Sequence, residues 1–155
     1  MSRPASIPDS HRDLLEGPID VALVTVMPDG QPQATVVWCN LEGPYVMVST
    51  MKGFRKERNM RARPQVALLA IDPADPLRWI EVRGTVELLE EGALAHLDRL
   101  TTLYTAAEHY FGQVVPAEYA RSEVPVIAQI TPDQVRAERF RRNPPSPYPS
   151  RTATC

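Results

Sequence analysis

The sequence predicts a mainly β protein of the α+β class, in which six or seven antiparallel strands form a small closed or split barrel with two or three helices. Strand-forming runs recur along most of the chain, separated by short turns rich in Pro, Asp, Asn and Gly. Helical periodicity is confined to a few segments. The length of 155 residues and the 43% hydrophobic content suit one domain with its own core. Closure is favoured because apolar strands in an open sheet would expose unpaired edges.

One folded domain is expected over residues 10–140, between two segments of different composition. Residues 1–9 are polar and rich in proline, and are expected to be flexible. Residues 141–155 are rich in proline and serine, which is typical of a disordered or extended tail. The domain is expected to begin with a short helix from Ser10 to Glu16, which Gly17-Pro18 ends.

The first three strands are expected to form an antiparallel meander. Their strand-forming runs cover residues 20–27, 32–39 and 44–49. Pro28-Asp29-Gly30 lies between the first two runs and is a turn signature, which predicts a hairpin. Asn40–Gly43 is expected to be the second turn.

A basic helix and two more strands are expected next. Helix-forming residues extend from Phe54 to Ala62, and Pro64 stops them. A buried strand is expected over residues 65–72 and a long strand over residues 77–89. Gly84 is expected to mark a bulge in the long strand.

The last third of the chain combines a helix, a loop and two strands. Apolar residues recur at three- and four-residue spacing within residues 90–105, which predicts a helix. Residues 106–121 are irregular and carry three aromatic side chains, so this loop is the expected cover of a groove. Strands are expected over residues 124–131 and 134–140.

The segment from residue 48 to residue 64 is the best candidate for a binding site. A strand end with two hydroxyl side chains, Ser49 and Thr50, leads through a glycine into a helix start with Arg55 and Lys56. Free N–H groups and the dipole at a helix N-terminus attract anions. A basic first turn opposes that dipole unless an anionic ligand is present, so the pattern indicates a phosphate site.

The same basic residues could instead form a solvated helix face or a docking surface for an acidic partner. Six of the 17 basic residues lie in this short stretch, namely Lys52, Arg55, Lys56, Arg58, Arg61 and Arg63. The formal net charge is nevertheless -2, which gives no reason to expect nucleic-acid binding.

Several other functional classes lack their signatures. Cys39 and Cys155 form no metal-binding or redox motif, and two reduced thiols favour a cytoplasmic protein. His11, His96 and His109 do not cluster; His96 is expected on the exposed side of its helix. There is no dinucleotide-binding glycine motif, catalytic triad order, signal peptide or membrane-length apolar run. No metal ligand or catalytic side chain is therefore assigned, and no membrane association is expected.

Four passages give the chain a family resemblance. It resembles the pyridoxamine-5'-phosphate-oxidase-like split barrels of the FMN-binding type, and within them the F420- or FMN-dependent oxidoreductases. The resemblance covers roughly residues 7–135. The passages are ALVTVMPDGQPQ (22–33), VVWC (36–39), RKERNM (55–60) and IDPADPLRWIEVRGTV (71–86).

The resemblance implies a homodimer with a cofactor in each of two grooves between the subunits. By that resemblance, Arg55 and Lys56 would hold the cofactor phosphate. Ser49 and Thr50 would bond to phosphate or ribityl oxygens, and Asn59 would support them.

The resemblance also implies which residues lie beside the ring system of the cofactor. The backbone of four consecutive residues would lie along the tricyclic ring, namely Thr35, Val36, Val37 and Trp38. Trp79 takes the position at which related flavin-binding members have a polar residue that touches the cofactor.

Coenzyme F420 is the favoured cofactor and FMN the alternative. F420 carries a polyanionic tail, for which Lys52 and Arg58 would add positive charge. The reaction implied is hydride transfer between reduced F420 and a small organic acceptor, with the cofactor supplying the reactive atom. Two other classes remain open, namely a non-catalytic flavin or heme carrier on the same barrel and a plain interaction domain.

Overall fold

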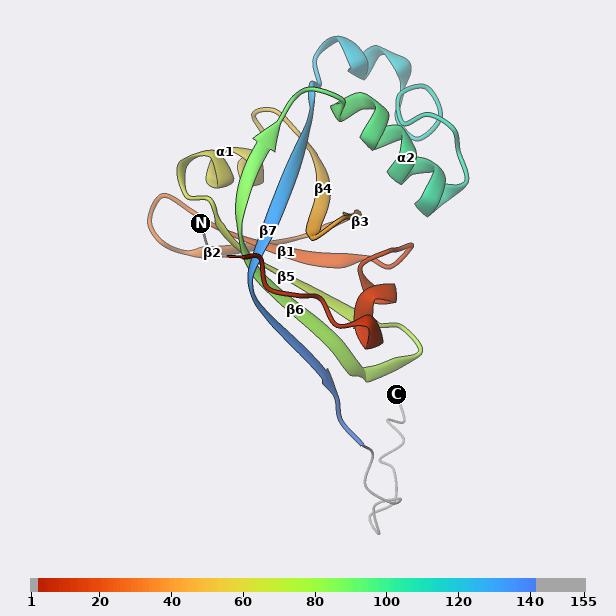
Figure 1. Ribbon diagram of the computed structural model, residues 1–155. Helices are drawn as coiled ribbons and strands as arrows, with labels where there is room; N and C mark the ends of the chain where they lie inside the picture. The colour runs from red at the N-terminus through yellow and green to blue at the C-terminus, as the bar shows by residue number, and fades with distance from the viewer. Residues whose placement is uncertain (1–2, 142–155) are drawn as a thin grey trace, which may run out of the picture.

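The computed structural model describes residues 3–141, which form a seven-stranded antiparallel sheet with the strand order β2-β1-β5-β6-β7-β4-β3 (Figure 1). This confirms the expected mainly β class. The strands are β1 (Val21–Val26), β2 (Pro32–Val37), β3 (Cys39–Glu42), β4 (Tyr45–Met51), β5 (Gln65–Asp72), β6 (Asp75–Leu89) and β7 (Pro125–Arg139). The helices are the 3-10 helices η1 (Asp9–Leu14) and η2 (Ala117–Arg121) and the α-helices α1 (Arg55–Ala62) and α2 (Ala93–Thr105).

The connection between β2 and β3 is a single residue long, although these two strands stand at opposite ends of the strand order. β1 and β2 form the expected hairpin, with Val21 opposite Val37. β3 and β4 lie at the other end of the strand order, so the expected three-stranded meander is wrong. Only Trp38 separates β2 from β3, and one residue spans at most about 7 Å between its neighbours. The two edges therefore meet at Trp38, and the sheet curls into a split barrel.

β6 and β7 are long partners that connect the two ends of the molecule (Figure 1). The two strands expected at residues 124–131 and 134–140 are one strand, because a bulge at Asp133 of β7 absorbs the irregularity between them. The register shifts opposite Arg83 and Gly84, so the irregularity lies beside Gly84 as predicted, but the extra residue is in β7 and not in the strand that carries the glycine. A Cβ atom at Gly84 would lie 2.4 Å from the carbonyl oxygen of Thr131, so no larger residue fits there without a backbone shift.

The core fills the inside of the barrel with aliphatic side chains. Leu23, Leu68, Ile80 and Ile130 are fully buried and come from four adjacent or nearly adjacent strands. Burial alternates along β1 and β6, as expected for strands with one face toward a core. α2 packs against β4 and β7.

The first residues contribute to this core. The Ala5 N–H donates to the Pro132 carbonyl at 2.8 Å, and Ile7 is buried. Residues 3–8 therefore pack on the barrel, whereas composition suggested a flexible segment. The tail expected at residues 141–155 lies, apart from Arg141, outside the described residues.

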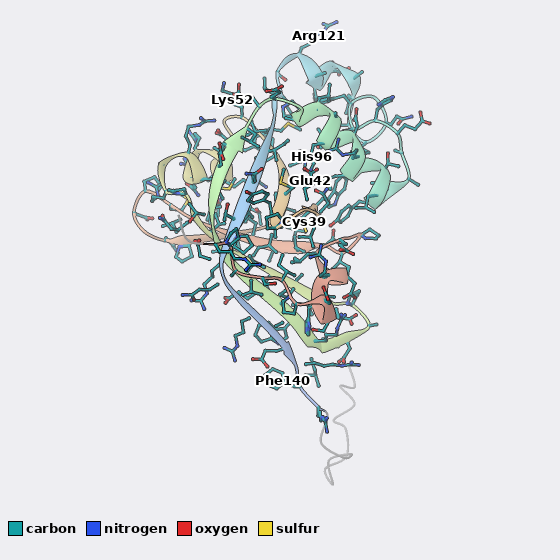
Figure 2. All side chains as sticks on the ribbon, in the orientation of Figure 1. Cys39, Glu42, Lys52, His96, Arg121 and Phe140 are labelled. Carbon is teal, nitrogen blue, oxygen red and sulfur yellow. The ribbon has the colours of Figure 1, made fainter. Side chains whose placement is uncertain are left out.

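His96 is buried between α2 and the sheet, near Cys39 and Glu42 (Figure 2). Its Nε2 lies 2.8 Å from Asn40 Oδ1, and its Nδ1 is buried without a hydrogen-bond partner. The expectation of an exposed histidine is wrong, because His96 shares the buried face of α2 with Leu97 and Leu100.

No helix in the described part of the chain is long and apolar enough to cross a membrane. Within residues 3–141, no group of three or more His, Cys, Asp or Glu side chains is placed to hold a metal ion.

Candidate functional site

A pocket of about 190 Å³ lies where the β2–β3 corner, the end of β4, the start of α1, and α2 with its following loop come together. Six of the twelve residues predicted for cofactor binding line it, and they reach it from three separate segments. These are Val36, Val37, Trp38, Ser49, Thr50 and Lys56. The remaining lining residues are Met51, Phe54, Leu97 and Tyr110.

The start of α1 is built as the sequence suggested, with one difference in its charge balance. The basic first turn also contains Glu57, which is 1% exposed. Its Oε2 accepts a hydrogen bond from the Gly53 N–H at 3.0 Å, and its Oε1 pairs with Arg61. Glu57 therefore fixes the turn before the helix by accepting from Gly53, one residue before the N-cap Phe54, and it places a negative charge in the first helical turn. Part of the conflict between the basic turn and the helix dipole is thus removed without a ligand.

Two residues that line the pocket have hydroxyl groups without a partner in the described part of the chain. The Oγ of Ser49 and the Oγ1 of Thr50 are both buried without a hydrogen bond there, and so is Thr35 Oγ1 on β2. A buried hydroxyl without a partner costs roughly 1–3 kcal/mol. Such groups are uncommon in folded proteins and suggest that a ligand or water completes them.

Lys56 brings the positive charge to the same pocket. Its side chain is half-buried, and loss of hydration lowers the pKa of its ammonium group. Among the described residues it has no ion-pair partner. An anion in the pocket would compensate this charge and reverse the cost of its burial.

The other basic residues of the predicted site lie outside the pocket. Arg55 and Arg58 are exposed and form no ion pair with the described residues. Lys52 is exposed and pairs with Glu90, the two side chains being 2.8 Å apart at Nζ and Oε1. Lys52 therefore already has a carboxylate partner, whereas Arg55 and Arg58 have none within the described residues.

Asn59 faces β1 and β2 instead of Ser49 and Thr50. It is fully buried, and its Nδ2 lies 3.0 Å from Thr25 Oγ1 and 3.2 Å from Gln33 Oε1. Its Oδ1 is buried and has no hydrogen-bond partner between residues 3 and 141. In this single chain Asn59 thus holds α1 on the hairpin and supports the pocket only through the position of the helix.

Trp79 and Thr35 also lie outside the pocket lining. Trp79 lies on β6, where Arg136 covers its ring at 5.5 Å and Phe140 packs at a centroid distance of 6.5 Å. It borders a separate hollow of about 440 Å³ on the outer face of β5 and β6. Within the single chain, Trp79 and Lys56 border different hollows.

Sequence reasoning missed four lining residues, for three reasons. Leu97 belongs to the apolar stripe of α2, and nothing in the periodicity separates a pocket residue from a core residue. Tyr110 lies in the loop that was expected to cover a groove, so the loop was identified but the side chain was not. Met51 and Phe54 surround Gly53 and become pocket residues because the chain turns there with a φ of +87°.

Trp38 is held in the pocket wall by Tyr104 of α2. The two rings stack with a centroid distance of 5.0 Å and an interplanar angle of 16°. The Tyr104 hydroxyl donates to the Ile19 carbonyl at 2.8 Å and accepts from the Cys39 N–H at 3.1 Å. Burial of the hydroxyl raises the pKa of Tyr104 to about 12, so it stays a neutral donor at physiological pH.

Comparison with known proteins shows the family and agrees with the fold. The family model described as pyridoxamine 5'-phosphate oxidase matches residues 7–139. A search of curated proteins gives no match. Among solved structures, one described as an F420 reductase is 32% identical, with a TM-score of 0.71, over 84% of this chain and 98% of that chain.

Two further solved structures share the fold at lower identity. The conserved hypothetical protein Rv2991 from Mycobacterium tuberculosis is 22% identical, with a TM-score of 0.66, over 88% of this chain and 86% of that chain. General Stress Protein 26 from Bacillus anthracis is 19% identical, with a TM-score of 0.57, over 81% of this chain and 88% of that chain. With the family model spanning nearly the whole described region, the chain belongs to the pyridoxamine-5'-phosphate-oxidase-like split-barrel family.

Proposed function

We propose that this protein is an oxidoreductase that binds coenzyme F420 and transfers hydride between its reduced form and a small organic acceptor. One observation carries the proposal: Ser49, Thr50 and Lys56 line one pocket, and within residues 3–141 the two buried hydroxyls have no hydrogen-bond partner and the half-buried lysine has no ion-pair partner. Such a set suits a phosphate, which accepts several hydrogen bonds and brings negative charge. The 32% identity with a structure described as an F420 reductase supports the choice of cofactor.

Each residue has a role in binding or orientation. Lys56 would neutralise the phosphate, and Ser49 and Thr50 would donate hydrogen bonds to its oxygens. Trp38, fixed by its stack on Tyr104, would limit the position of the ring system. When bound, F420 supplies the hydride from its deazaflavin ring, so the chain needs no nucleophile of its own.

Charge on α1 supports F420 over FMN. The F420 tail carries a phosphodiester and several carboxylates, whereas FMN ends in one phosphate. Arg55 and Arg58 are exposed on the same helix as Lys56 and have no ion-pair partners within the described residues. Exposed pairs are each worth about 1 kcal/mol or less, so these arginines would adjust the preference and its salt dependence.

The proposal includes a homodimer with the cofactor near the subunit boundary. Trp79 would then approach the cofactor of the second chain. A cytoplasmic location remains a prediction from the sequence.

Side-by-side titration of the purified protein with F420 and FMN, followed by absorbance and fluorescence, tests the proposal. Tighter binding of F420, followed by oxidation of reduced F420 when a quinone is added, is the expected result. Tight binding of FMN without binding of F420 would show that FMN is the cofactor. Binding without turnover on any acceptor would make the protein a carrier, and binding of neither would remove the proposed function.

A further inference from the structure

We propose that Tyr110 is the acceptor-facing hydrogen-bond donor of the pocket, that Asp98 positions it, and that the acceptor is a flat molecule with a hydrogen-bond-accepting oxygen. This inference rests on the proposed function and assigns the acceptor side of the same site. It concerns the loop between α2 and η2, whose sequence matches no recognised motif.

The polar groups of the pocket come from two places. Ser49, Thr50 and Lys56 belong to the end of β4 and the start of α1. Tyr110 reaches the pocket from the loop after α2. α2 packs on β4 and β7, so β4 carries Ser49 and Thr50 of the first group and also supports the helix that precedes the Tyr110 loop. The phosphate chemistry needs only the first group, which leaves the Tyr110 hydroxyl for another ligand.

Asp98 of α2 fixes the backbone of the loop at Tyr110. Its Oδ1 accepts a hydrogen bond from the Tyr110 N–H at 2.9 Å. Its Oδ2 lies 3.2 Å from His109 Nδ1. Both carboxylate oxygens thus hold two consecutive residues of the loop, and the Asp98 side chain is only 25% exposed.

The loop adds its own bonds around this anchor. The Tyr110 carbonyl accepts from the N–H groups of Val114 and Val115 at 2.9 and 3.1 Å. The Phe111 ring meets the Tyr110 ring edge-on, with centroids 5.2 Å apart. Thr102 of α2 donates its hydroxyl to the Ala107 carbonyl at 2.9 Å. The Tyr110 backbone is therefore fixed on both sides.

The Tyr110 hydroxyl is free to serve a ligand. Within the described residues, its Oη has no hydrogen-bond partner, although the residue is half-buried in the pocket wall. Burial, with a smaller contribution from Glu123, raises the pKa of Tyr110, which keeps the group protonated as a donor. Leu97 and Trp38 supply apolar surface in the same pocket, which suits a flat ligand.

Two probes that differ only in their oxygens test the assignment. Menadione is a flat quinone with two carbonyl oxygens, and 2-methylnaphthalene has the same carbon frame without them. Their binding is followed by quenching of tryptophan fluorescence, in cofactor-free protein and again with F420 bound. Binding of F420 itself is measured separately for each variant.

Tyr110→Phe is expected to weaken menadione binding about five- to tenfold and to leave 2-methylnaphthalene and F420 binding unchanged. Asp98→Asn, which can still accept the Tyr110 N–H, should stay within about twofold of wild type. Asp98→Ala should match Tyr110→Phe and also speed amide hydrogen exchange at Tyr110. Glu108→Ala, an exposed change in the same loop, is the matched control.

The results separate this proposal from the proposed function. Unchanged menadione binding in Tyr110→Phe, equal loss of both probes, or no menadione binding by wild type would overturn it. If wild type binds neither F420 nor FMN while the menadione series behaves as expected, the proposed function fails and the assignment of Tyr110 stands.

Discussion

Lys56 is the residue at which anion binding can be tested most directly, because its ammonium group lines the pocket without a partner in the described chain. Lys56→Ala removes one charge-assisted hydrogen bond, of order 1.5–3 kcal/mol, so F420 binding should weaken roughly ten- to a hundredfold. Arg55→Ala should cost less, since Arg55 is exposed. Dissociation constants from fluorescence titration provide the measurement.

Arg121→Ala removes the same charge from exposed η2 and serves as the control, with unchanged affinity expected. The melting temperature of the cofactor-free Lys56→Ala protein should not fall, because the removed charge is partly desolvated. An affinity equal to that of wild type would place the anion site elsewhere.

His96 makes stability depend on pH. Burial, followed by the nearby Arg99, lowers its pKa from 6.5 to about 4, and Glu42 opposes this only in part. The unfolded chain therefore binds more protons than the folded chain between about pH 6.5 and 4, so this contribution to stability is lost as the pH falls through that window. The loss should be on the order of 1–3 kcal/mol, measured by urea unfolding.

His96→Gln removes the titration and should flatten the curve between pH 6.5 and 4. His109→Gln is the comparison, because His109 is exposed and pairs with Asp98 at the surface. A curve for His96→Gln that stays as steep as that of wild type would show that other groups set the pH dependence.

At the scale of the elements, the close approach of β6 and β7 at Gly84 can be tested by adding one methyl group to the glycine. Gly84→Ala places a Cβ 2.4 Å from the Thr131 carbonyl oxygen, so β6 and β7 must move apart. We expect a loss of about 1–3 kcal/mol, or more, in the free energy of unfolding. Chemical denaturation provides the measurement.

Gly43→Ala is the matched control, since a Cβ there meets nothing within 4 Å and only the positive φ of 56° is unfavourable. It should cost about 1–2 kcal/mol. A smaller loss at Gly84 than at Gly43 would mean that the paired strands adapt easily.

Local sequence signals predicted element types better than they predicted strand partners. The basic helix was placed within one residue, because Pro64 and the change from strand-forming to helix-forming residues are local. The meander was wrong because pairing across the barrel depends on closure, which no short segment encodes. β7 was divided because Thr131-Pro132 resembles a break, whereas a bulge at Asp133 lets β7 continue its pairing with β6 on both sides.

In the candidate site, too, the sequence predicted which nearby residues come together but not which distant residues join them. Ser49, Thr50 and Lys56 follow one another within eight residues, so their proximity could be expected from the sequence. Leu97 and Tyr110 come from the last third of the chain and reach the pocket only through the packing of α2, which sequence spacing cannot express.

At the scale of the molecule, the outer face of β1, β5 and β6 predicts self-association. Val24, Leu69, Ile71 and Trp79 border one hollow there, and Ile71 is 46% exposed. Ile71→Glu should convert a dimer at micromolar concentration into a monomer, because it places a charge in an apolar contact. Sedimentation velocity provides the measurement.

Leu94→Glu on α2 is the matched control, since Leu94 is 52% exposed and lies away from that hollow. It should remain dimeric. A wild-type protein that sediments only as a monomer would contradict the prediction and would leave Trp79 without a route to a cofactor.

Trp38 joins the two edges of the sheet and also forms a wall of the pocket. A partly unfolded chain in which β3 and β4 have left the barrel therefore has no binding site, even if β1, β2, β5 and β6 remain paired. A ligand in this pocket selects the closed barrel alone, so occupancy suppresses sub-global opening as well as global unfolding. Even the edge strands β2 and β3, which lie far apart in the strand order, should gain protection together when the site fills.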